Sequence, residues 1–449
     1  MFSKRTFPGG AHPLRREHHG KGFSDQQAIQ VLPAPEQVIL PLSQHVGAPC
    51  APAVHKGDLV KMGQVVGQMR GYVAAPIHAS VSGEVVAVEE RLHPNGQRVM
   101  SVVIQNDFQD TPAGELTPIE PWRESDPETL LARIKEAGIV GLGGAAFPTH
   151  VKLSPPEGKT CDVVIVNGAE CEPFLTADHR VMVERSRAVV QGLQIAKYIL
   201  GARAGYIGVE DNKPDAMLAL GQAAGSDLSL EVVTLPVKYP QGSEKQLIYA
   251  LTRRKVPAGG LPIDAGVVVI NASTAAAIAD AVTRGLPLVS RVVTVTGYEV
   301  KAPANFLVRL GTPVSTLIQE VGGLPAATGK VIAGGPMMGQ ALFDLDVPVI
   351  KGTSGILMLP EAKTQPKKPT NCIRCGRCVS VCPMHLLPLS ISAHSLAGNV
   401  GETEKLGVLN CLECGCCDYS CPASRPLLES LRVAKRAVIA ARRNKEGGK

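Results

Sequence analysis

Long hydrophobic runs are absent from the 449-residue sequence. The apolar stretch GVVVINASTAAAIADAV is interrupted by Asn271, Ser273, Thr274 and Asp280, and no run reaches the length of about 18 apolar residues that marks a membrane span. The N-terminus, MFSKRTFPGGAHPLRREHHGKG, is positively charged but contains no apolar segment. We therefore expect neither a signal peptide nor a membrane-spanning helix.

Aromatic residues are also scarce, at 4% of the sequence. No stretch interleaves basic and aromatic side chains as nucleic-acid grooves do, so we expect no nucleic-acid partner. Cysteine is rare outside one region, because only Cys50, Cys161 and Cys171 lie outside residues 372–421. We expect these three to be packing residues. Thiols concentrated in this way indicate metal ligands in a reducing cytosol.

Two runs near the C-terminus contain the other cysteines, NCIRCGRCVSVCP (371–383) and NCLECGCCDYSCP (410–422). Each has the spacing C-x2-C-x2-C-x3-C-P, the bacterial ferredoxin arrangement in which the fourth cysteine ligates the other cluster. The spacing therefore predicts two [4Fe–4S] clusters with crossed ligand sets. Cluster one would take Cys372, Cys375, Cys378 and Cys421, and cluster two would take Cys411, Cys414, Cys417 and Cys382.

Zinc and disulfides are the alternatives for these cysteines. Zinc ribbons also use C-x2-C pairs, but four ligands per zinc give no reason for the third cysteine of each triad. Disulfides would need an oxidising compartment and a secretory route. Cys416 fits no ligand position, and we expect it to be a bystander.

Basic charge is concentrated in the same part of the chain. Residues 363–449 contain 14 Lys/Arg and 6 Asp/Glu, a net charge of +8, whereas the whole chain carries +6. Thiolate-bound clusters are negative, so part of this surplus would offset their charge. The remainder suits an acidic partner or an anionic membrane surface.

The length of the chain predicts several domains, beginning with an N-terminal extension over residues 1–35. Residues 36–110 have short alternating runs typical of compact β structure. Within them, HKGDLVKMGQVVGQM and APIHASVSGEVVAV resemble the barrel-sandwich hybrid of biotinyl and lipoyl domains. Those domains carry their cofactor on a hairpin lysine, but residues 69–83 contain no lysine. We therefore expect a structural module rather than a swinging arm.

The remainder is expected to complete a multidomain α/β and β protein. Residues 120–285 alternate helix-like and strand-like segments, which predicts an α/β domain with a largely parallel sheet. Residues 290–345 resemble the SLBB β-grasp module. Residues 360–370 form a Pro/Lys-rich linker to a helical, ferredoxin-like domain with two [4Fe–4S] clusters over residues 371–449.

A final helix is predicted after the second cysteine run, because Leu427, Leu431, Ala434 and Val438 recur at helical spacing. Basic residues lie mostly off this stripe: Arg432, Lys435, Arg436, Arg442 and Arg443. One interpretation is a helix packed on the cluster domain with a solvated basic face. The other is adhesion to a membrane surface.

The electron donor to the clusters is expected to bind at GIVGLGGAAFPTHVK (138–152). Gly141, Gly143 and Ala146 match G-x-G-x-x-[GA], but the dinucleotide fingerprint needs a strand before it and a helix after it. Here a helix is predicted before it, and a proline follows soon after. A glycine loop can still approach a flat ligand closely. Lys152 would supply a cation for a phosphate or a ring.

Polar side chains follow the next predicted strand, in NGAECEP. Asn167, Glu170 and Glu172 come just past its end, where open α/β sheets bind ligands. A tight turn with exposed carboxylates would give the same pattern, and these residues alone leave both interpretations open.

GLGGAAFPTHVK and NGAECEP resemble the flavin loops of the NADH-oxidising subunit of respiratory complex I, and YPQGSEKQL (239–247) and NASTAAAI (271–278) match it more loosely. In that family these segments surround FMN and NADH. The resemblance implies that Gly141, Gly143, Gly144, Lys152, Asn167 and Glu170 lie at FMN, that Phe147, Glu172, Gly242 and Glu244 lie towards NADH, and that Asn271 and Thr274 lie near the flavin phosphate. The sequence departs from the family pattern at Ala169 and Ser243, where the family has acids.

The whole chain resembles the RnfC family, which supplies one subunit of the Rnf complexes, the membrane-bound ferredoxin:NAD⁺ oxidoreductases. FPGGAHP, LPLSQHVGAPCAPAVHKGD, APIHASVSGEV, NGAECEPFLTADHR and both cysteine runs occur in the family's order. The resemblance implies an NADH-linked, flavin and iron–sulfur oxidoreductase subunit that exchanges electrons between NADH and the two clusters through FMN. No catalytic acid or base is needed for hydride transfer, because the cofactors supply the reaction.

The same resemblance implies a place in a larger assembly. Integral-membrane partners would move Na⁺ or H⁺, ferredoxin would react elsewhere in the complex, and this chain would lie peripherally on the cytoplasmic face of the inner (plasma) membrane. Two other functions remain open. A cobalamin-reducing flavoprotein of propanediol-degrading microcompartments has the same module order, and a flavin-free electron carrier would have vestigial glycine loops.

Overall fold

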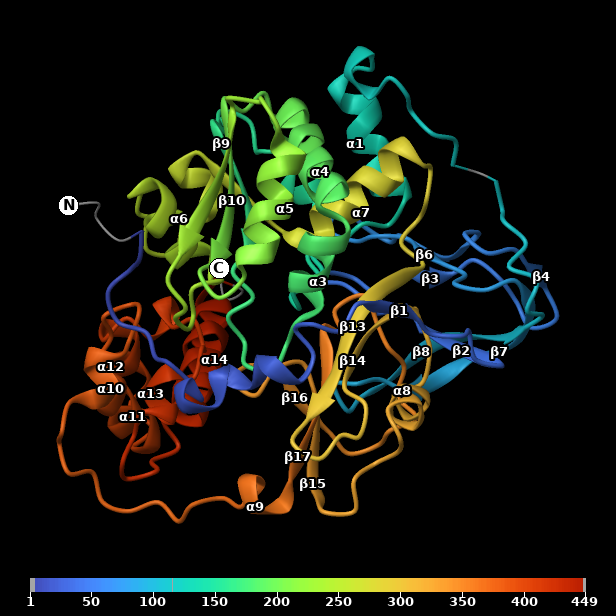
Figure 1. Cartoon of the computed structure of the whole chain (residues 1–449). Coiled ribbons are helices and arrows are strands. Elements are labelled where there is room, and N and C mark those ends of the chain that lie inside the picture. The colour runs from blue at the N-terminus through green and yellow to red at the C-terminus, as the bar shows by residue number, and fades with distance from the viewer. Residues whose placement is uncertain (1–4, 115, 447–449) are drawn as a thin grey trace.

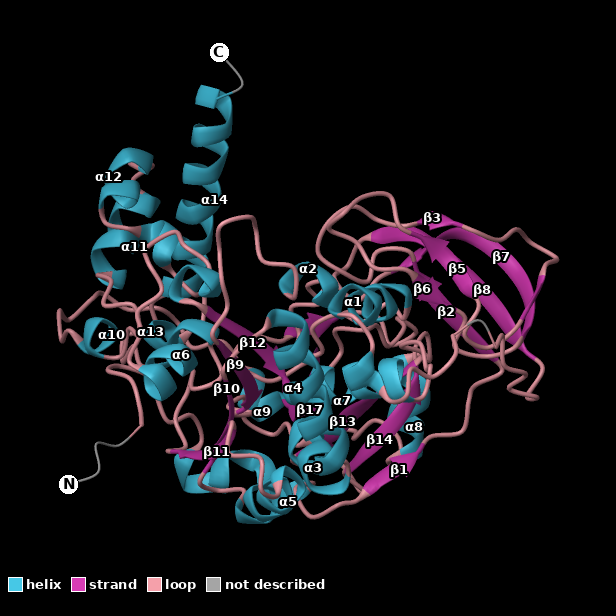
Figure 2. Cartoon of the chain, turned by 90° about the horizontal axis from the view of Figure 1, so that it is seen from above, coloured by secondary structure: helices cyan, strands magenta, loops and turns pink. Residues whose placement is uncertain are grey.

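Four sheets and a helical C-terminal domain make up the molecule, described by a computed structural model over residues 5–114 and 116–446 (Figure 1). The α/β domain lies between the β-rich hybrid domain and the helical domain (Figure 2). One continuous hydrophobic core extends from Leu32 to Met358, so the first three domains pack as one unit. The helical domain has a core of its own, around Leu431 and Val438.

The hybrid domain consists of two small antiparallel sheets, in the orders β2-β8-β7-β4 and β3-β5-β6. Its strands are β2 (Gln37–Pro41), β3 (Ala51–Pro52), β4 (Leu59–Val60), β5 (Val65–Gln68), β6 (Ile77–His78), β7 (Gly83–Leu92) and β8 (Arg98–Asn106).

The stretch that would bear a carrier lysine in lipoyl domains is fixed in place. Within residues 69–83, Ala74, Ala75 and Ile77 are fully buried. The buried ammonium group of Lys351 donates to the carbonyl of Pro76 at 2.7 Å and to that of Gly138 at 2.8 Å. These contacts tie the hairpin to the α/β domain, as expected of a structural module.

The α/β domain has a four-stranded sheet, β11-β10-β9-β12, in which every pairing is parallel. Its elements are η2 (Trp122–Glu124), α1 (Pro127–Glu136), α2 (Thr149–Lys152), β9 (Val163–Gly168), α3 (Ala177–Glu184), α4 (Ser186–Leu200), β10 (Ala204–Glu210), α5 (Pro214–Ala224), β11 (Leu230–Leu235), α6 (Glu244–Thr252), η3 (Pro262–Ala265), β12 (Val267–Asn271) and α7 (Ala272–Thr283). Val164 and Val166 of β9 pack into the main core, whereas Val163 and Ile165 pack into a second core with α6. Both faces of the sheet are therefore covered, which explains its continuous β-branched runs.

A six-stranded mixed sheet, β1-β14-β13-β17-β15-β16, follows the α/β domain. It contains β13 (Ser290–Gly297), β14 (Ala304–Arg309), β15 (Thr328–Ala333) and β16 (Gln340–Leu342), with α8 (Val314–Glu320) packed nearby. Two further strands come from outside the predicted range 290–345: β1 (Ile29–Val31) and β17 (Gly355–Pro360). Both pairings arise from distant segments, which is why local sequence patterns did not reveal them.

The two predicted connecting segments also differ from simple tails and linkers. Residues within 1–35 form η1 (Arg15–Phe23) and contribute β1 to the sheet. The linker 360–370 begins with a short helix, α9 (Glu361–Thr364), and then crosses to the helical domain as an extended segment (Figure 1).

The C-terminal domain is helical: α10 (Arg377–Ser380), α11 (Pro388–Leu396), α12 (Val400–Lys405), η4 (Val408–Asn410), α13 (Cys416–Tyr419) and α14 (Leu427–Glu446). The four apolar residues predicted to share one face of α14 are all buried. Arg432 and Lys435 bind Glu413, and Arg442 binds Glu404. The helix is thus packed on its own domain, and part of its basic face is neutralised there. Within the described residues, no helix is both long and apolar enough to cross a membrane.

Candidate functional site

A cavity of about 500 Å³ opens at the carboxyl ends of β9 and β12, within the usual size range of ligand pockets. Asn167 and Asn271 end these two strands and are partners in the parallel register. Eleven of the twelve residues predicted to bind FMN or NADH line the cavity: Gly141, Gly143, Phe147, Lys152, Asn167, Glu170, Glu172, Gly242, Glu244, Asn271 and Thr274. Gly144, the twelfth, follows Gly143 directly but is not part of the wall. Loops distant in sequence therefore meet at one edge of the sheet.

The glycine loop is a closed turn between α1 and α2. A β-bridge joins Val140 and Pro148 at its base, and the amide of Gly141 donates to the carbonyl of Phe147 at 2.9 Å. A helix rather than a strand precedes the loop, so the dinucleotide-fingerprint context is absent, as expected. The turn holds its backbone at the cavity wall without any strand to support it.

Two glycines of this loop have different reasons to lack a side chain. A β-carbon on Gly143 would lie 3.3 Å from Nδ2 of Asn271, a close contact. Gly144 has φ +104°, a conformation that side chains rarely adopt, and faces open space. The loop is thus shaped by backbone demands of the chain as well as by access to a ligand.

The N-terminus of α7 borders the cavity and is held by a network of polar side chains. Asn271 caps the helix by accepting from the amide of Thr274 at 3.2 Å, and its Nδ2 donates to Asp178 at 2.6 Å. Oγ1 of Thr274 accepts from the amide of Leu142 at 2.8 Å, which fixes the glycine loop to the helix. Helix N-termini favour anions, so this end of the cavity suits the phosphate of FMN.

Lys152 forms an ion pair with Glu244 and donates to the carbonyl of Val269 at 2.9 Å. Both side chains are partly exposed in the cavity wall. The cation predicted to meet a flavin phosphate or ring is therefore shared with an acid that was predicted to lie towards NADH. This pairing holds the loops 141–152 and 239–247 together.

The side chain of Glu170 is 6% exposed, and its carboxylate accepts from the backbone amide of Asp178 at 2.8 Å, at the N-terminus of α3. Burial raises the pKa of Glu170 to about 7. Lys21 of η1 reaches the same loop, where its Nζ donates to the carbonyls of Glu170, Glu172 and Leu175 at 2.7, 3.0 and 2.6 Å. The N-terminal extension therefore shapes the loop that follows β9.

Glu172 connects the cavity to the six-stranded sheet. Its carboxylate accepts from the backbone amides of Met337 and Met338 at 3.0 and 2.8 Å. Burial raises the pKa of Glu172 to about 7, because these two amides compensate only in part for the lost hydration. Its predicted place towards NADH stays a prediction, but the structure adds a role in ordering the loop after β15.

We expect Glu172→Gln to flatten the pH dependence of stability. A carboxyl group whose folded-state pKa is raised holds its proton more tightly in the folded state, so its contribution to stability falls as pH rises from about 4.5 to about 7. The wild-type advantage over the variant should therefore shrink by up to about 3 kcal/mol between these pH values. Unfolding measured from pH 5 to 7.5, with the exposed Glu128→Gln as control, tests this. Parallel curves for wild type and Glu172→Gln would contradict it.

The cluster cysteines surround two separate spaces in the C-terminal domain. One is lined by Cys372, Cys375, Cys378 and Cys421, and the other by Cys411, Cys414, Cys417 and Cys382. These are the two crossed sets assigned from the spacing, each closed by the distant fourth cysteine. Over residues 5–114 and 116–446, no group of three or more His, Cys, Asp or Glu is gathered closely enough for a single metal ion. A multi-iron cluster takes its thiolates around a larger centre.

The two cysteine runs fold alike. Arg374 and Glu413 have positive φ angles of 54° and 56°, and Gly376 and Gly415 have φ angles of 72° and 78°. These pairs occupy equivalent places in each run, which gives both triads the same turn.

The remaining cysteines lie outside the two predicted ligand sets. Cys416 is buried and borders the second space, but its Sγ lies 3.8 Å from the carbonyl of Tyr239. Cys50 and Cys161 pack in the main core, as expected. Cys171 packs beside Tyr239 and also lies in the cavity wall, so it has a place at the site that the sequence did not indicate.

The cavity and the second cysteine set share a wall. Leu412 and Cys414 line the cavity together with Tyr239, whose buried hydroxyl donates to the carbonyl of Cys414 at 2.8 Å. Gln246 of α6 donates to the carbonyl of Pro383 at 3.1 Å. Cys414 thus belongs to the surroundings of both sites.

The N-terminal FPGGAHP segment fastens this junction. The amide of Gly10 donates to the carbonyl of Val381 at 2.8 Å, and Ala11 exchanges two backbone hydrogen bonds with Tyr239. A β-carbon on Gly9 would lie 2.8 Å from the carbonyl oxygen of Cys382, so only glycine fits this approach. The segment therefore clamps the cluster domain to the α/β domain.

Several residues of the site were not predicted from the sequence: Lys21, Asp178, Tyr239 and Arg291. Tyr239 begins the loosely matching segment YPQGSEKQL, but nothing in that match singled it out, and Arg291 lies outside the motifs. Asp178 could have been found, because it follows NGAECEP by only a few residues in the segment NGAECEPFLTADHR. Lys21 had no signal beyond its place in the basic N-terminus.

Four family models match the chain in the order of its domains. They are the RnfC barrel-sandwich hybrid domain (residues 5–109), the Nuo51 FMN-binding domain (134–280), the SLBB domain (292–341) and the 4Fe-4S dicluster domain (371–424). The predicted flavin residues lie within the FMN-binding match, and both cysteine sets lie within the dicluster match. FMN and two [4Fe–4S] clusters are therefore the cofactors of this chain.

Curated relatives extend over almost the whole sequence. The chain is 52% identical, over 98% of both chains, to a subunit of the Na(+)-translocating ferredoxin:NAD(+) oxidoreductase complex of Acetobacterium woodii. It is 47% identical to a subunit of the proton-translocating complex of Clostridium ljungdahlii, over 86% of this chain and 84% of that one. It is 42% identical to a subunit of the ion-translocating oxidoreductase complex of Rhodobacter capsulatus, over 95% of this chain and 82% of that one. All three relatives bear the same letter, C, in their complexes, and they confirm the family that the sequence motifs indicated.

Proposed function

Because the chain belongs to the RnfC family of ion-translocating ferredoxin:NAD⁺ oxidoreductase complexes, we propose that it is the NADH-linked electron-transfer subunit of such a complex. NADH exchanges a hydride with FMN in the cavity, and electrons pass one at a time between FMN and the clusters. The flavin supplies the conversion between two-electron and one-electron steps, while the protein supplies position and electrostatics.

One observation carries this proposal: the cavity lined by the flavin loops also contains Cys414 in its wall. Cluster two, held by Cys411, Cys414, Cys417 and Cys382, is therefore the cluster next to the flavin. Cluster one lies beyond it, and its ligands Cys372 and Cys375 are exposed. Electrons from NADH reach cluster two first and leave the chain from cluster one.

The residues of the cavity then have separate tasks. The glycine loop and the N-terminus of α7, capped by Asn271, bind the flavin and its phosphate. Phe147 and the Lys152–Glu244 pair face the nicotinamide side. Tyr239 and Leu412 pack between the cavity and cluster two, and exclude water from the space that electrons cross.

The partners follow from the family and from charge. Other subunits of the complex, including integral-membrane ones, carry out ion movement, and ferredoxin reacts elsewhere in the assembly. The walls around cluster one contain Arg374 and Arg425, so this end suits an acidic electron-transfer partner. The chain itself lies on the cytoplasmic face of the membrane as a peripheral subunit.

Co-purification tests this function against its alternatives. A tagged chain from detergent-solubilised membranes should retain membrane subunits and reduce a one-electron dye with NADH. Recovery without any membrane subunit, together with reduction of cob(II)alamin, would favour the corrinoid reductase. Recovery with intact clusters but without flavin would favour the electron carrier.

Peripheral attachment predicts a limited role for the exposed charges of α14. Deleting residues 432–449 is a poor test, because Ala434 and Val438 belong to the core and Lys435 donates to the carbonyl of Cys411 at 2.9 Å. The double variant Arg436→Glu and Arg443→Glu changes only exposed charges on this helix. If partner subunits hold the chain, membrane recovery should fall by less than about twofold, since exposed charges contribute weakly at physiological salt. A loss of most recovery with both clusters intact would instead assign docking to this helix.

A further inference from the structure

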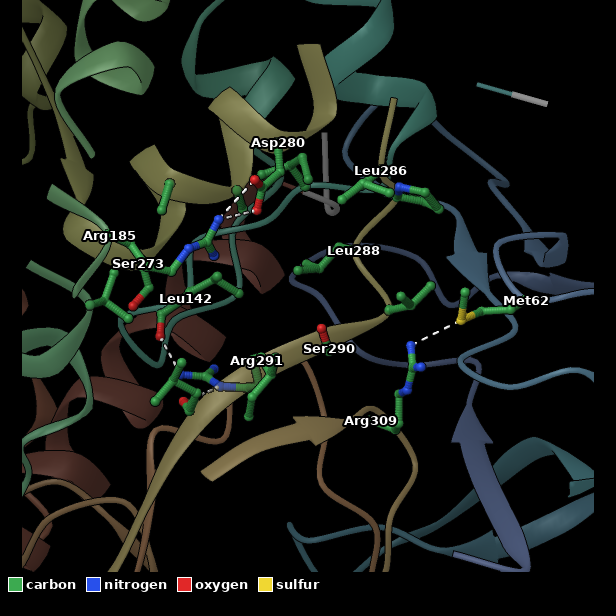
Figure 3. Close-up of a pocket in the computed structure, with 18 residues that line it drawn as sticks. Met62, Leu142, Arg185, Ser273, Asp280, Leu286, Leu288, Ser290, Arg291 and Arg309 are labelled. Atoms are coloured by element: carbon green, nitrogen blue, oxygen red, sulfur yellow. Dashed lines mark hydrogen bonds and ion pairs between the residues drawn. The ribbon is translucent and has the colours of Figure 1, made fainter. Parts of the chain in front are cut away.

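A second cavity, of about 280 Å³, lies on the other side of the glycine loop from the flavin cavity. Three parts of the molecule enclose it: Met62 of the hybrid domain, residues of α7, and strands β13 and β14 (Figure 3). None of the residues that the sequence predicted to bind FMN or NADH lines it. It is therefore a separate space, and its chemistry has to be considered by itself.

Arginine side chains surround this space on three sides. Arg185, Arg291 and Arg309 point around one opening in Figure 3, whereas Asp280 is the only acid in the wall among the described residues. Asp280 is already neutralised, because Arg185 binds both of its oxygens at 2.7 and 2.8 Å and Arg284 adds a third contact at 3.2 Å. The wall thus has an excess of positive charge.

Arg291 is the most unusual of the three. It is only 4% exposed, and its guanidinium donates to the backbone carbonyls of Lys351, Leu142 and Val292. In the described part of the chain, no carboxylate lies within ion-pair distance of it. Buried charges are normally paired, so a cation held by neutral carbonyls leaves an anion unsupplied. Burial lowers the pKa of Arg291 to about 10, so the group stays charged at neutral pH.

Arg309 is also incompletely matched inside the cavity. One guanidinium nitrogen binds Asp110, but the other faces the sulfur of Met62 at 2.9 Å. A thioether is a weak acceptor, so this nitrogen can donate to a better one. Because Arg291 borders the flavin cavity as well, Arg309 is the arginine that belongs to this cavity without belonging to the other. The remaining wall is apolar: Ile139, Leu142, Val181, Leu288, Val292 and Leu307.

We propose that this cavity binds a small organic anion with an apolar body, its acidic group held between Arg291 and Arg309. The volume is close to the lower end of the range for ligand pockets, which limits the body to about one ring or a short chain. The positive wall provides the anion site, and the aliphatic wall provides the enclosure for the body.

The loop between the two cavities would transmit occupancy of this site. Leu142 lines the new cavity, whereas its neighbours Gly141 and Gly143 line the flavin cavity. Its carbonyl accepts from Arg291 at 3.1 Å, and its amide donates to Thr274 at 2.8 Å. An anion that draws the guanidinium away from the carbonyl of Leu142 would change the support of the flavin loop. Two sites that share one wall in this way are coupled reciprocally.

Binding can be tested on the FMN-loaded, cluster-loaded protein with 4-fluorobenzoate, observed by ¹⁹F NMR, and with neutral 4-fluorobenzamide for comparison. We expect saturable binding of the carboxylate and at least tenfold weaker binding of the amide. Arg309→Gln should weaken carboxylate binding about tenfold, because it removes a charged hydrogen-bond donor. Arg284→Gln is the matched control, since Arg284 binds the same Asp280 from outside the wall. It should bind the probe as wild type does.

Ala277→Leu gives a second test, because Ala277 lies in the wall on α7 and a larger side chain would fill the cavity. Loss of probe binding with the flavin retained is expected. No binding at millimolar carboxylate, equal binding of the amide, or full binding in Ala277→Leu would each overturn the proposal. Coupling is read separately from the affinity for FMN with and without saturating carboxylate. An unchanged FMN affinity would reject coupling through Leu142.

Discussion

Gly143→Val is expected to abolish FMN binding. The β-carbon alone would lie 3.3 Å from Nδ2 and 3.4 Å from Cβ of Asn271, and the branches of valine need more room still. Asn271 would have to move, but it caps α7 and is bound to Asp178. The substitution therefore both fills the cavity wall and disturbs the helix N-terminus assigned to the phosphate. FMN released by denaturing the purified variant should fall at least tenfold below the wild-type stoichiometry.

Gly141→Ala provides the matched control in the same loop. Its β-carbon would come no closer than 3.7 Å to any other atom, which is ordinary van der Waals contact. This variant should retain most of its FMN. If the valine variant keeps its flavin, or if both variants lose it to the same extent, the flavin does not bind where the loop approaches Asn271.

Cys421→Ser should remove cluster one and leave cluster two in place. Cys421 lies in the second cysteine run, yet it lines the space formed by Cys372, Cys375 and Cys378 of the first run. Serine is a poor substitute for a thiolate on iron. Anaerobic reconstitution should therefore yield about four iron atoms and four sulfides per chain, in place of about eight of each.

The reciprocal variant, Cys382→Ser, should remove cluster two, and Cys416→Ser should leave both clusters intact because its Sγ faces Tyr239. EPR spectra of the two reduced single-cluster variants should add to that of the wild type, apart from coupling between the clusters. Loss of the Cys411 cluster in Cys421→Ser would show that each run holds its own cluster.

Most of the cavity could be predicted because its residues belong to contiguous motifs. GLGGAAFPTHVK and NGAECEP each place several side chains within one loop, and the parallel sheet then brings the loops to one edge. The crossed cysteine sets follow from spacing alone, because the turn of each triad is local and repeated.

What could not be predicted depends on contacts between distant segments. Lys21 reaches the loop after β9 across about 150 positions, and β1 and β17 complete a sheet whose other strands lie elsewhere in the sequence. Glu172 shows the same limit: its motif was recognisable, but its binding to the amides of Met337 and Met338 was not. Such pairings leave no periodicity or spacing within a short window of sequence.

The central claim is that electrons from NADH pass through FMN to cluster two and then to cluster one. The most direct measurement is freeze-quench EPR of the reconstituted protein after anaerobic mixing with NADH, using wild type and the two single-cluster variants. We predict NADH-dependent cluster reduction in wild type and in Cys421→Ser, which retains the cluster beside the cavity. Cys382→Ser should reduce its flavin but show at least tenfold slower reduction of cluster one. Rapid reduction of cluster one in Cys382→Ser, or bleaching of flavin with no cluster signal in wild type, would contradict this order.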